Sequence, residues 1–193
     1  SFIDLATFMP ARMLGYNQKK YIDNNIGGTI NILEFCRINN VDRLLFAQTF
    51  GDILENCKQN PYLNNEMAPK LDYHDTKSVY ITSMNSCVEL IKCYHALYGL
   101  KAFIFRLPTI HYWTNITYCE EGKATKEGYR ILIDQASKGE DIHVWGNLYK
   151  KKDMIYVKDL CQEFYKACFV ERDYGFYNVG TGVGITLLDQ IKG

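Results

Sequence analysis

The feature that most constrains this chain is the alternation of short, nearly uninterrupted apolar runs with longer amphipathic segments. Three runs, FIDLA at residues 2–6, RLLFAQ at 43–48 and AFIFRL at 102–107, have the length and composition of buried strands. Between them, residues 17–39 and 77–98 carry apolar side chains at three- and four-residue steps, which is typical of helices. This order of strands and helices predicts a parallel sheet that helices cover on both faces, which is an α/β fold of the doubly wound type.

The pattern changes after Pro108, which closes the third apolar run. Residues 1–108 hold the repeating strand and helix units, and residues 109–193 hold shorter, more mixed segments. Residues 109–125 are polar and aromatic without periodicity, so we expect them to be irregular. Further helices are expected at 129–137 and 159–169, and a further strand at 176–179. We therefore predict two units that meet at residue 108, the second of them smaller and incomplete.

Charge and hydropathy exclude several classes of partner. The chain has 193 residues, with 22 basic and 22 acidic side chains and therefore no formal net charge. A neutral chain has no general attraction for phosphate backbones or anionic lipid, so we expect neither a nucleic acid nor a membrane surface as its partner. The apolar runs fall far short of the roughly 18–20 residues of a transmembrane helix, and residues 1–15 do not resemble a secretory signal.

The seven cysteines are scattered along the chain. No two have the C-x-x-C spacing of a metal site or redox motif, and their number is odd. This usage is typical of a reduced protein, so we expect a cytoplasmic location and no metal.

Candidate site residues follow from the predicted sheet, because ligands of such sheets bind beyond the carboxyl ends of the strands. Those ends are residues 5–7, 48–49 and 106–109, and Tyr80 follows in the first turns of the next helix. A hydroxyl and a phenol that meet there can polarise a carbonyl group and transfer a proton. A phenol with a pKa of about 10 is a poor base unless a cation lies nearby, yet the residue one helical turn later is Met84. A purely structural tyrosine stays open as the alternative.

Other lysines and histidines offer weaker signals. Tyr73 and Lys77 also have a four-residue spacing, and Lys77 could reach back to Tyr80 as a substitute cation. The run at residues 150–152 is either a solvated hairpin or a phosphate contact. His111 and His143 are expected to be surface or packing residues.

Two groups of glycines need explanation. The string at residues 180–184 resembles a dinucleotide-binding loop, but Ile185 stands where the third glycine belongs, so we predict a turn. Gly27 and Gly28 lie inside a predicted helix, which they weaken, so we expect a neighbouring backbone to pack closely against them.

Several strings along the chain match known motifs in order. Residues 21–34 resemble a helix with the pattern N-x-x-G-T-x-N-x-L-E, residues 5–7 a strand end H-L-A-A with Asp4 for the histidine, and FAQT at 46–49 a strand that ends in a catalytic serine or threonine. The strings YGL at 98–100, RLPTI at 106–110, KDMIYVKDL at 152–160 and YNVGTG at 177–182 complete the series. In this order they resemble the NAD-dependent epimerase/dehydratase family, extended short-chain dehydrogenases/reductases that act on nucleotide sugars.

The resemblance implies a partial Rossmann-type sheet with part of a small C-terminal substrate lobe, and it implies roles for individual residues. Thr49 and Tyr80 take the catalytic positions, and counting back from Arg106 places the family lysine at Met84 rather than Lys77. NAD is the implied cofactor, and a nucleotide sugar is the implied substrate. Residues implied to line the nicotinamide half of the NAD site are Leu5, Ala6, Thr7, Asn24 and Pro108. Thr109 would face the sugar, Lys152 would meet a diphosphate oxygen, and the two long helices would form a homodimer.

Three departures from the family pattern bear on activity. Met84 supplies neither charge nor a hydrogen-bond donor, and Lys152 replaces an arginine. The chain opens at Ser1 without methionine, and we expect it to be a fragment that begins after the glycine-rich pyrophosphate loop and has lost NAD affinity. Two hypotheses remain: a nucleotide-sugar epimerase or dehydratase with weakened or altered chemistry, and a non-catalytic relative that serves as a binding or scaffold protein.

Overall fold

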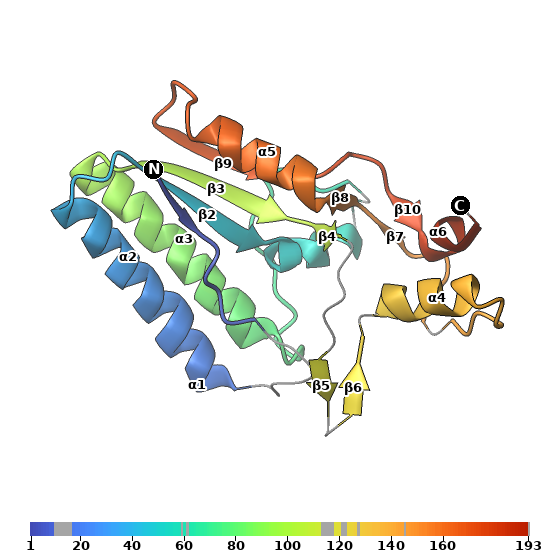
Figure 1. The fold of residues 1–193 in the computed structure, drawn as a ribbon. Coiled ribbons are helices and arrows are strands. Elements are labelled where there is room, and N and C mark those ends of the chain that lie inside the picture. The colour runs from blue at the N-terminus through green and yellow to red at the C-terminus, as the bar shows by residue number, and fades with distance from the viewer. Residues whose placement is uncertain are drawn as a thin grey trace.

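The computed structural model describes residues 1–9, 17–58, 60, 62–112, 118–120, 123–126, 128–144 and 146–192. Its centre is a four-stranded parallel sheet in the order β1-β2-β3-β9. The strands are β1 (Phe2–Asp4), β2 (Arg43–Thr49), β3 (Lys101–Leu107) and β9 (Tyr174–Asn178). All four carboxyl ends lie at one edge of the sheet (Figure 1), and the predicted parallel α/β fold is confirmed.

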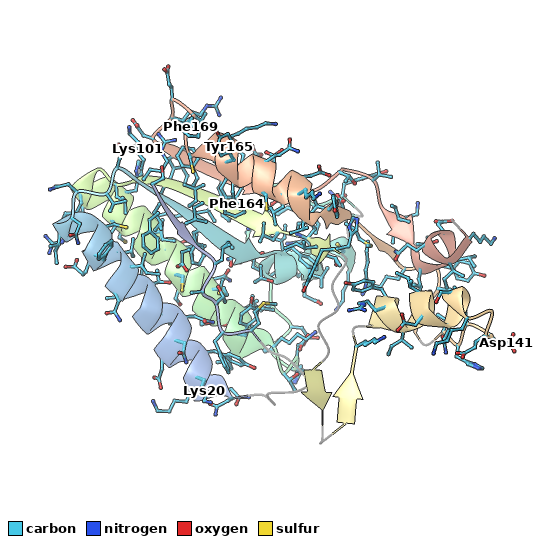
Figure 2. The ribbon with its side chains drawn as sticks, viewed as in Figure 1. Lys20, Lys101, Asp141, Phe164, Tyr165 and Phe169 are labelled. Carbon is cyan, nitrogen blue, oxygen red and sulfur yellow. The ribbon has the colours of Figure 1, made fainter. Side chains whose placement is uncertain are left out.

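Helices cover both faces of this sheet (Figure 1). One face carries α1 (Gln18–Lys20), the π-helical segment η2 (Tyr21–Ile26), α2 (Gly27–Ile38) and α3 (Ser78–Tyr98). The other face carries α5 (Val157–Ala167). Successive strand residues therefore point into two cores: Leu44 contributes to the core under α2 and α3, and Leu45 to the core under α5. In the second core the Phe164 ring lies 4.7 Å from the Phe105 ring, between α5 and the sheet (Figure 2).

The remaining elements gather beyond the carboxyl edge of the sheet (Figure 1). They are β4 (Thr109–His111), which pairs with β8 (Met154–Tyr156); β5 (Tyr118–Glu120), which pairs with β6 (Lys123–Thr125); β7 (Lys151–Lys152), which pairs with β10 (Ile185–Thr186); and the helices α4 (Gly128–Ser137) and α6 (Leu187–Lys192). The expectation of irregular structure over residues 109–125 is therefore wrong for three short strands. The partner of β4 lies far along the chain, so local periodicity gives no sign of it. The domain boundary at residue 108 stays a prediction.

The connection from β2 to α3 contains two short 3-10 turns, η3 (Phe50–Asp52) and η4 (Leu54–Lys58). At its far end, α3 stops at Gly99, whose φ of 70° is favourable only for glycine. The expectation for Gly27 and Gly28 is wrong, because a Cβ at either position would meet nothing within 4 Å.

Within the described residues, no helix is long and apolar enough to cross a membrane. The same part of the chain contains no cluster of three or more metal-ligating side chains. Free thiols are found at Cys36, Cys57, Cys87, Cys93, Cys161 and Cys168.

Candidate functional site

The structure brings Thr49 and Tyr80 together at the carboxyl edge of the sheet. Thr49 ends β2, and its Oγ1 accepts a hydrogen bond from the Gly51 N–H at 3.1 Å. Tyr80 lies in the first turn of α3 and is only 7% exposed, and its phenol lies close enough to the Thr49 side chain for that side chain to lower its pKa. The Gln48 side chain accepts from the Thr49 N–H at 2.9 Å and so fixes the backbone at this point. A hydroxyl and a phenol thus meet above the sheet, as the sequence predicts.

The Tyr80 phenol is held in its neutral form. Burial raises the pKa of Tyr80 to about 12, although the hydrogen bond from Thr49 acts in the opposite direction. A phenol with this pKa donates a hydrogen bond at neutral pH but accepts a proton poorly.

Among the described residues, no cation offsets the burial of Tyr80. Met84, one turn further along α3, is 1% exposed, and its thioether carries no charge. The groups of the described chain that shift the Tyr80 pKa besides Thr49 are Cys87 and Tyr21, and both raise it. Lys77 is exposed and directly precedes α3, and its backbone N–H donates a hydrogen bond to the Asp75 carboxylate. The structure therefore does not bring Lys77 to Tyr80 as a substitute for the family lysine.

The segment after β1 lies beside this pair. Leu5 is 62% exposed, Ala6 is exposed and Thr7 is partly buried. Phe8 is fixed by the Asn25 side chain, which accepts from the Phe8 N–H at 2.8 Å and donates to its carbonyl at 3.2 Å. The Phe8 ring lies 5.7 Å from the Tyr21 ring, which lies 5.8 Å from the Tyr80 ring. Three aromatic rings therefore pack in series from the post-β1 segment to the candidate phenol.

Asn24 does not join this group. Its side chain is exposed and donates to the Lys20 carbonyl at 2.9 Å. The buried asparagine is Asn25, which also donates to Ser83 Oγ of α3 at 3.0 Å. Counting the pattern N-x-x-G-T back from Thr29 gives Asn25, so the spacing contains the signal that points to it.

Asp52, and its ion pair with Arg106, are absent from the sequence-based expectations for the site, whereas Arg106 belongs to the candidate strand end at residues 106–109. Arg106 Nη2 lies 2.6 Å from Asp52 Oδ2, and the two side chains are 2% and 1% exposed. Asp52 follows Thr49 by three residues, and Arg106 lies opposite Gln48 in the sheet. A charged residue inside an apolar strand needs a buried partner, so Arg106 carried a signal, but the sequence did not identify that partner.

The implied substrate residues are distributed over the neighbouring elements. Pro108 and Thr109 are partly buried and lead from β3 into β4. Lys152 is exposed on β7, opposite Ile185 of β10. In the described chain no hydrogen bond joins Lys152 to Thr49 or Tyr80, so its role stays a prediction.

The glycine-rich string at residues 180–184 forms a loop around a carboxylate of the chain itself. Asp153 accepts from the Thr181 N–H at 3.0 Å, from the Thr181 hydroxyl at 2.8 Å and from the Gly182 N–H at 2.9 Å. A Cβ on Gly180 would lie 2.5 Å from Asp153 Oδ2, so this close approach requires glycine. The loop is therefore a turn built on Asp153.

Comparison with known proteins identifies the family. The model of the NAD dependent epimerase/dehydratase family matches residues 14–180. The chain belongs to this family. It is 28% identical over 160 residues to a putative UDP-glucose 4-epimerase from Methanocaldococcus jannaschii, which covers 83% of this chain and 48% of that protein. It is 26% identical over 189 residues to the UDP-glucuronate 4-epimerase of Thermodesulfobacterium geofontis, and the match covers 98% of this chain and 54% of that protein.

Solved structures show the same fold for epimerases of this family. The UDP-N-acetylglucosamine 4-epimerase from Methanobrevibacter ruminantium M1, in complex with UDP-N-acetylmuramic acid, superimposes with a TM-score of 0.78 at 21% identity, over 99% of this chain and 58% of that one. The UDP-glucuronic acid 4-epimerase from Bacillus cereus in complex with NAD superimposes with a TM-score of 0.74 at 19% sequence identity, over 97% of this chain and 56% of that one. The chain spans about half the length of the curated relatives that it matches.

Proposed function

We propose that the candidate site binds a nucleotide sugar, and that Tyr80 acts there as a neutral hydrogen-bond donor, so that the epimerase or dehydratase chemistry of the family is weakened or absent in this chain. The observation that carries the proposal is the buried Met84 one turn after Tyr80, together with the pKa of about 12 at that phenol. No cation of the described residues stabilises the phenolate, and a phenol with this pKa is an inefficient base near neutral pH.

The proposed binding roles use groups that remain competent. Thr49 holds a sugar hydroxyl or carbonyl together with Tyr80, and Thr109 faces the sugar from the start of β4. Lys152 meets a diphosphate oxygen as a point charge, because an ammonium group lacks the two-pronged geometry with which arginine binds phosphate.

The described residues fit only part of an NAD site. Leu5, Ala6 and Thr7 at the end of β1, with Pro108 after β3, offer a surface for the nicotinamide half. When bound, NAD accepts and returns a hydride in such families. The donor that would hold the nicotinamide ribose is replaced by Met84, and the 193 residues contain no G-x-x-G-x-x-G string. The fit is therefore incomplete, and we propose weak or no NAD affinity for this chain.

A second candidate is a non-catalytic binding or scaffold protein. It is favoured by the packing of Tyr80 beneath Tyr21, which leaves 7% of the phenol residue exposed. A cytoplasmic location and a homodimer through the long helices also stay predictions, the latter testable by sedimentation equilibrium.

The test uses the full-length protein carrying this sequence, with Met84→Lys and the matched control Met84→Leu. UDP-glucose and NAD binding are measured by calorimetry, and turnover by chromatography of the nucleotide sugars. We expect binding of UDP-glucose without appreciable turnover in the native protein, and gain of turnover in Met84→Lys alone. Binding with no gain in Met84→Lys supports the scaffold candidate. Failure of a panel of UDP-sugars to bind, or native turnover at a normal family rate, overturns the proposal.

A further inference from the structure

A buried ion pair joins the carboxyl ends of three strands. Arg106 of β3 donates from Nε and Nη2 to Asp52 Oδ2, at 3.1 and 2.6 Å, and from Nη1 to Asn178 Oδ1 of β9 at 3.0 Å. Its guanidinium group also lies 4.4 Å from the centre of the Phe176 ring. Asp52 belongs to η3, directly after β2. We refer to Asp52, Arg106, Asn178 and Phe176 as the strand-end clamp.

Stability alone does not account for the clamp. Burial raises the pKa of the Asp52 carboxyl, in spite of the hydrogen bonds from Arg106 that lower it. Removing two charges from water is expensive, and apolar pairs of similar volume often stabilise a fold as well or better. A buried ion pair of this kind is more informative about geometry, because it fixes the relative positions of the elements that carry its two charges.

One of those elements carries the Thr49 hydroxyl. Asp52 closes the turn η3, in which the Gly51 N–H donates to Thr49 Oγ1 at 3.1 Å. A Cβ on Gly51 would lie 3.2 Å from the Ile81 side chain, so the turn also sits tightly against α3. Because the Gly51 N–H occupies one lone pair of Oγ1, the orientation of this turn decides whether the Thr49 hydroxyl can meet Tyr80.

The clamp also holds the connection that leads to Tyr80. The Asp52 carbonyl accepts from the Lys70 N–H at 2.7 Å, and the Asn65 side chain donates to the Phe176 carbonyl at 3.3 Å. The connection between β2 and α3 is therefore attached to the clamp at Lys70, which bonds to Asp52, and at Asn65, which bonds to Phe176. Thr49 and Tyr80 lie at the two ends of this attached segment.

We propose that Asp52 and Arg106 are positioning residues, which hold the turn after β2 so that the Thr49 hydroxyl keeps one orientation beside Tyr80. The consequence for sugar binding rests on the proposed function. The geometric part does not depend on it, since it concerns only the orientation of Thr49.

The decisive measurement is the side-chain rotamer of Thr49, obtained from three-bond methyl couplings in the threonine-labelled full-length protein. The native protein is compared with Asp52→Leu/Arg106→Met, which replaces both charges by apolar side chains of similar size and so leaves no lone buried charge. We expect one Thr49 rotamer in the native protein and averaging over two or more in the double variant. A single, unchanged rotamer in a folded double variant overturns the proposal.

Two further variants keep the result interpretable. Lys101→Met removes a cation at the opposite end of β3, where Lys101 pairs with Asp42 at 3.0 Å, and is expected to leave Thr49 unchanged. If Lys101→Met also releases Thr49, general loosening is the cause and the proposal is wrong. Should the double variant fail to fold, Asn178→Ala decides, because it removes one guanidinium bond without removing charge. It is expected to loosen Thr49 partly, and an unchanged rotamer there counts against the clamp.

A binding arm separates this inference from the proposed function. Thr49→Val is expected to weaken UDP-glucose binding about threefold to tenfold, the effect of one lost hydrogen bond. In the double-variant background the same substitution should have almost no further effect, because both changes act through one hydroxyl. Full additivity of the two losses overturns the clamp's positioning role. If the native protein binds no UDP-sugar, the proposed function fails while the rotamer measurement still decides the positioning role.

Discussion

Two buried acidic groups at the same edge of the sheet, the Asp52 carboxyl and the Tyr80 phenol, differ in one respect. Asp52 and Arg106 bury opposite charges in direct contact, whereas Tyr80 has the uncharged Met84 one helical turn away. Burial opposes ionisation in both places and raises the pKa of Asp52 as well as that of Tyr80. Only the first pair contains a counter-ion that acts against this effect. The comparison shows that burial raises the pKa of both groups, and that among the described residues a cation lies against only one of them.

The largest expected effect is on the free energy of unfolding, which should differ between removing one partner of the Asp52–Arg106 ion pair and replacing both. Arg106→Met alone leaves the Asp52 carboxylate buried without a cation, and we expect it to lower the free energy of unfolding by about 3–5 kcal/mol. The double variant Asp52→Leu/Arg106→Met should be as stable as the native protein, or more stable by up to about 4 kcal/mol. Urea unfolding followed by circular dichroism measures both. Equal losses in the single and double variants would contradict this account.

The second prediction uses the phenol without a counter-ion. Because the pKa of Tyr80 is about 12 in the folded chain and 10 when unperturbed, the unfolded state loses this proton first as pH rises. The stability that Tyr80 contributes is therefore complete below pH 10 and is lost as pH approaches 12, by about 2–3 kcal/mol. Urea unfolding at stepped pH should show a shallower alkaline decline in Tyr80→Phe than in the native protein. Parallel declines would mean that Tyr80 titrates normally.

The third prediction asks what Met84 contributes. Met84→Leu nearly conserves volume and should change the free energy of unfolding by less than about 1.5 kcal/mol, with the Tyr80 titration unchanged. Met84→Lys should instead lower the pKa of Tyr80, because an ammonium group favours the phenolate. Tyrosine ring-carbon NMR, assigned with Tyr80→Phe, reports the titration. An identical Tyr80 titration in Met84→Lys and Met84→Leu would show that the side chain at position 84 does not influence the pKa of Tyr80.

The smallest effects compare two glycines, one beside the clamp and one remote from it. Gly27→Ala should stabilise the protein by about 0.5–1 kcal/mol, because the position is helical and a Cβ meets open space. Gly51→Ala should destabilise it, since its Cβ would lie 3.2 Å from Ile81 and 3.3 Å from Thr49 Oγ1. Thermal unfolding of the two variants shows whether each substitution raises or lowers the stability of the protein. Stabilisation by Gly51→Ala would show that the turn after β2 is looser than the clamp requires.

The sequence predicted the central sheet well because β2 and β3 carry their signal locally, as continuous apolar runs between amphipathic helices. It also placed Thr49 and Tyr80 at one edge, since parallel strands share their carboxyl ends. It missed β4, whose partner β8 lies far along the chain, and it missed Asp52, which sits in a long connection without periodicity. Both depend on contacts between distant segments.

The choice of Asn24 shows a different limit. Adjacent residues of a helical segment such as η2 point in different directions, so only one of two neighbouring asparagines faces α3. The structure gives that position to Asn25, while Asn24 faces solvent. A motif read one residue out of step thus assigns a surface residue to a site, even where the family and the fold are identified correctly.

The loop around Asp153 has a consequence for how anions meet this protein. Its amide groups already enclose a resident carboxylate, which occupies the place that a phosphate takes in loops of similar composition. A phosphate could bind these amide groups only by displacing the Asp153 carboxylate, which is part of the same chain and therefore always present at the loop. The Asp153 carboxylate thus holds this loop in shape, and the exposed Lys151 and Lys152 of β7 are nearby cations that an anion can still contact.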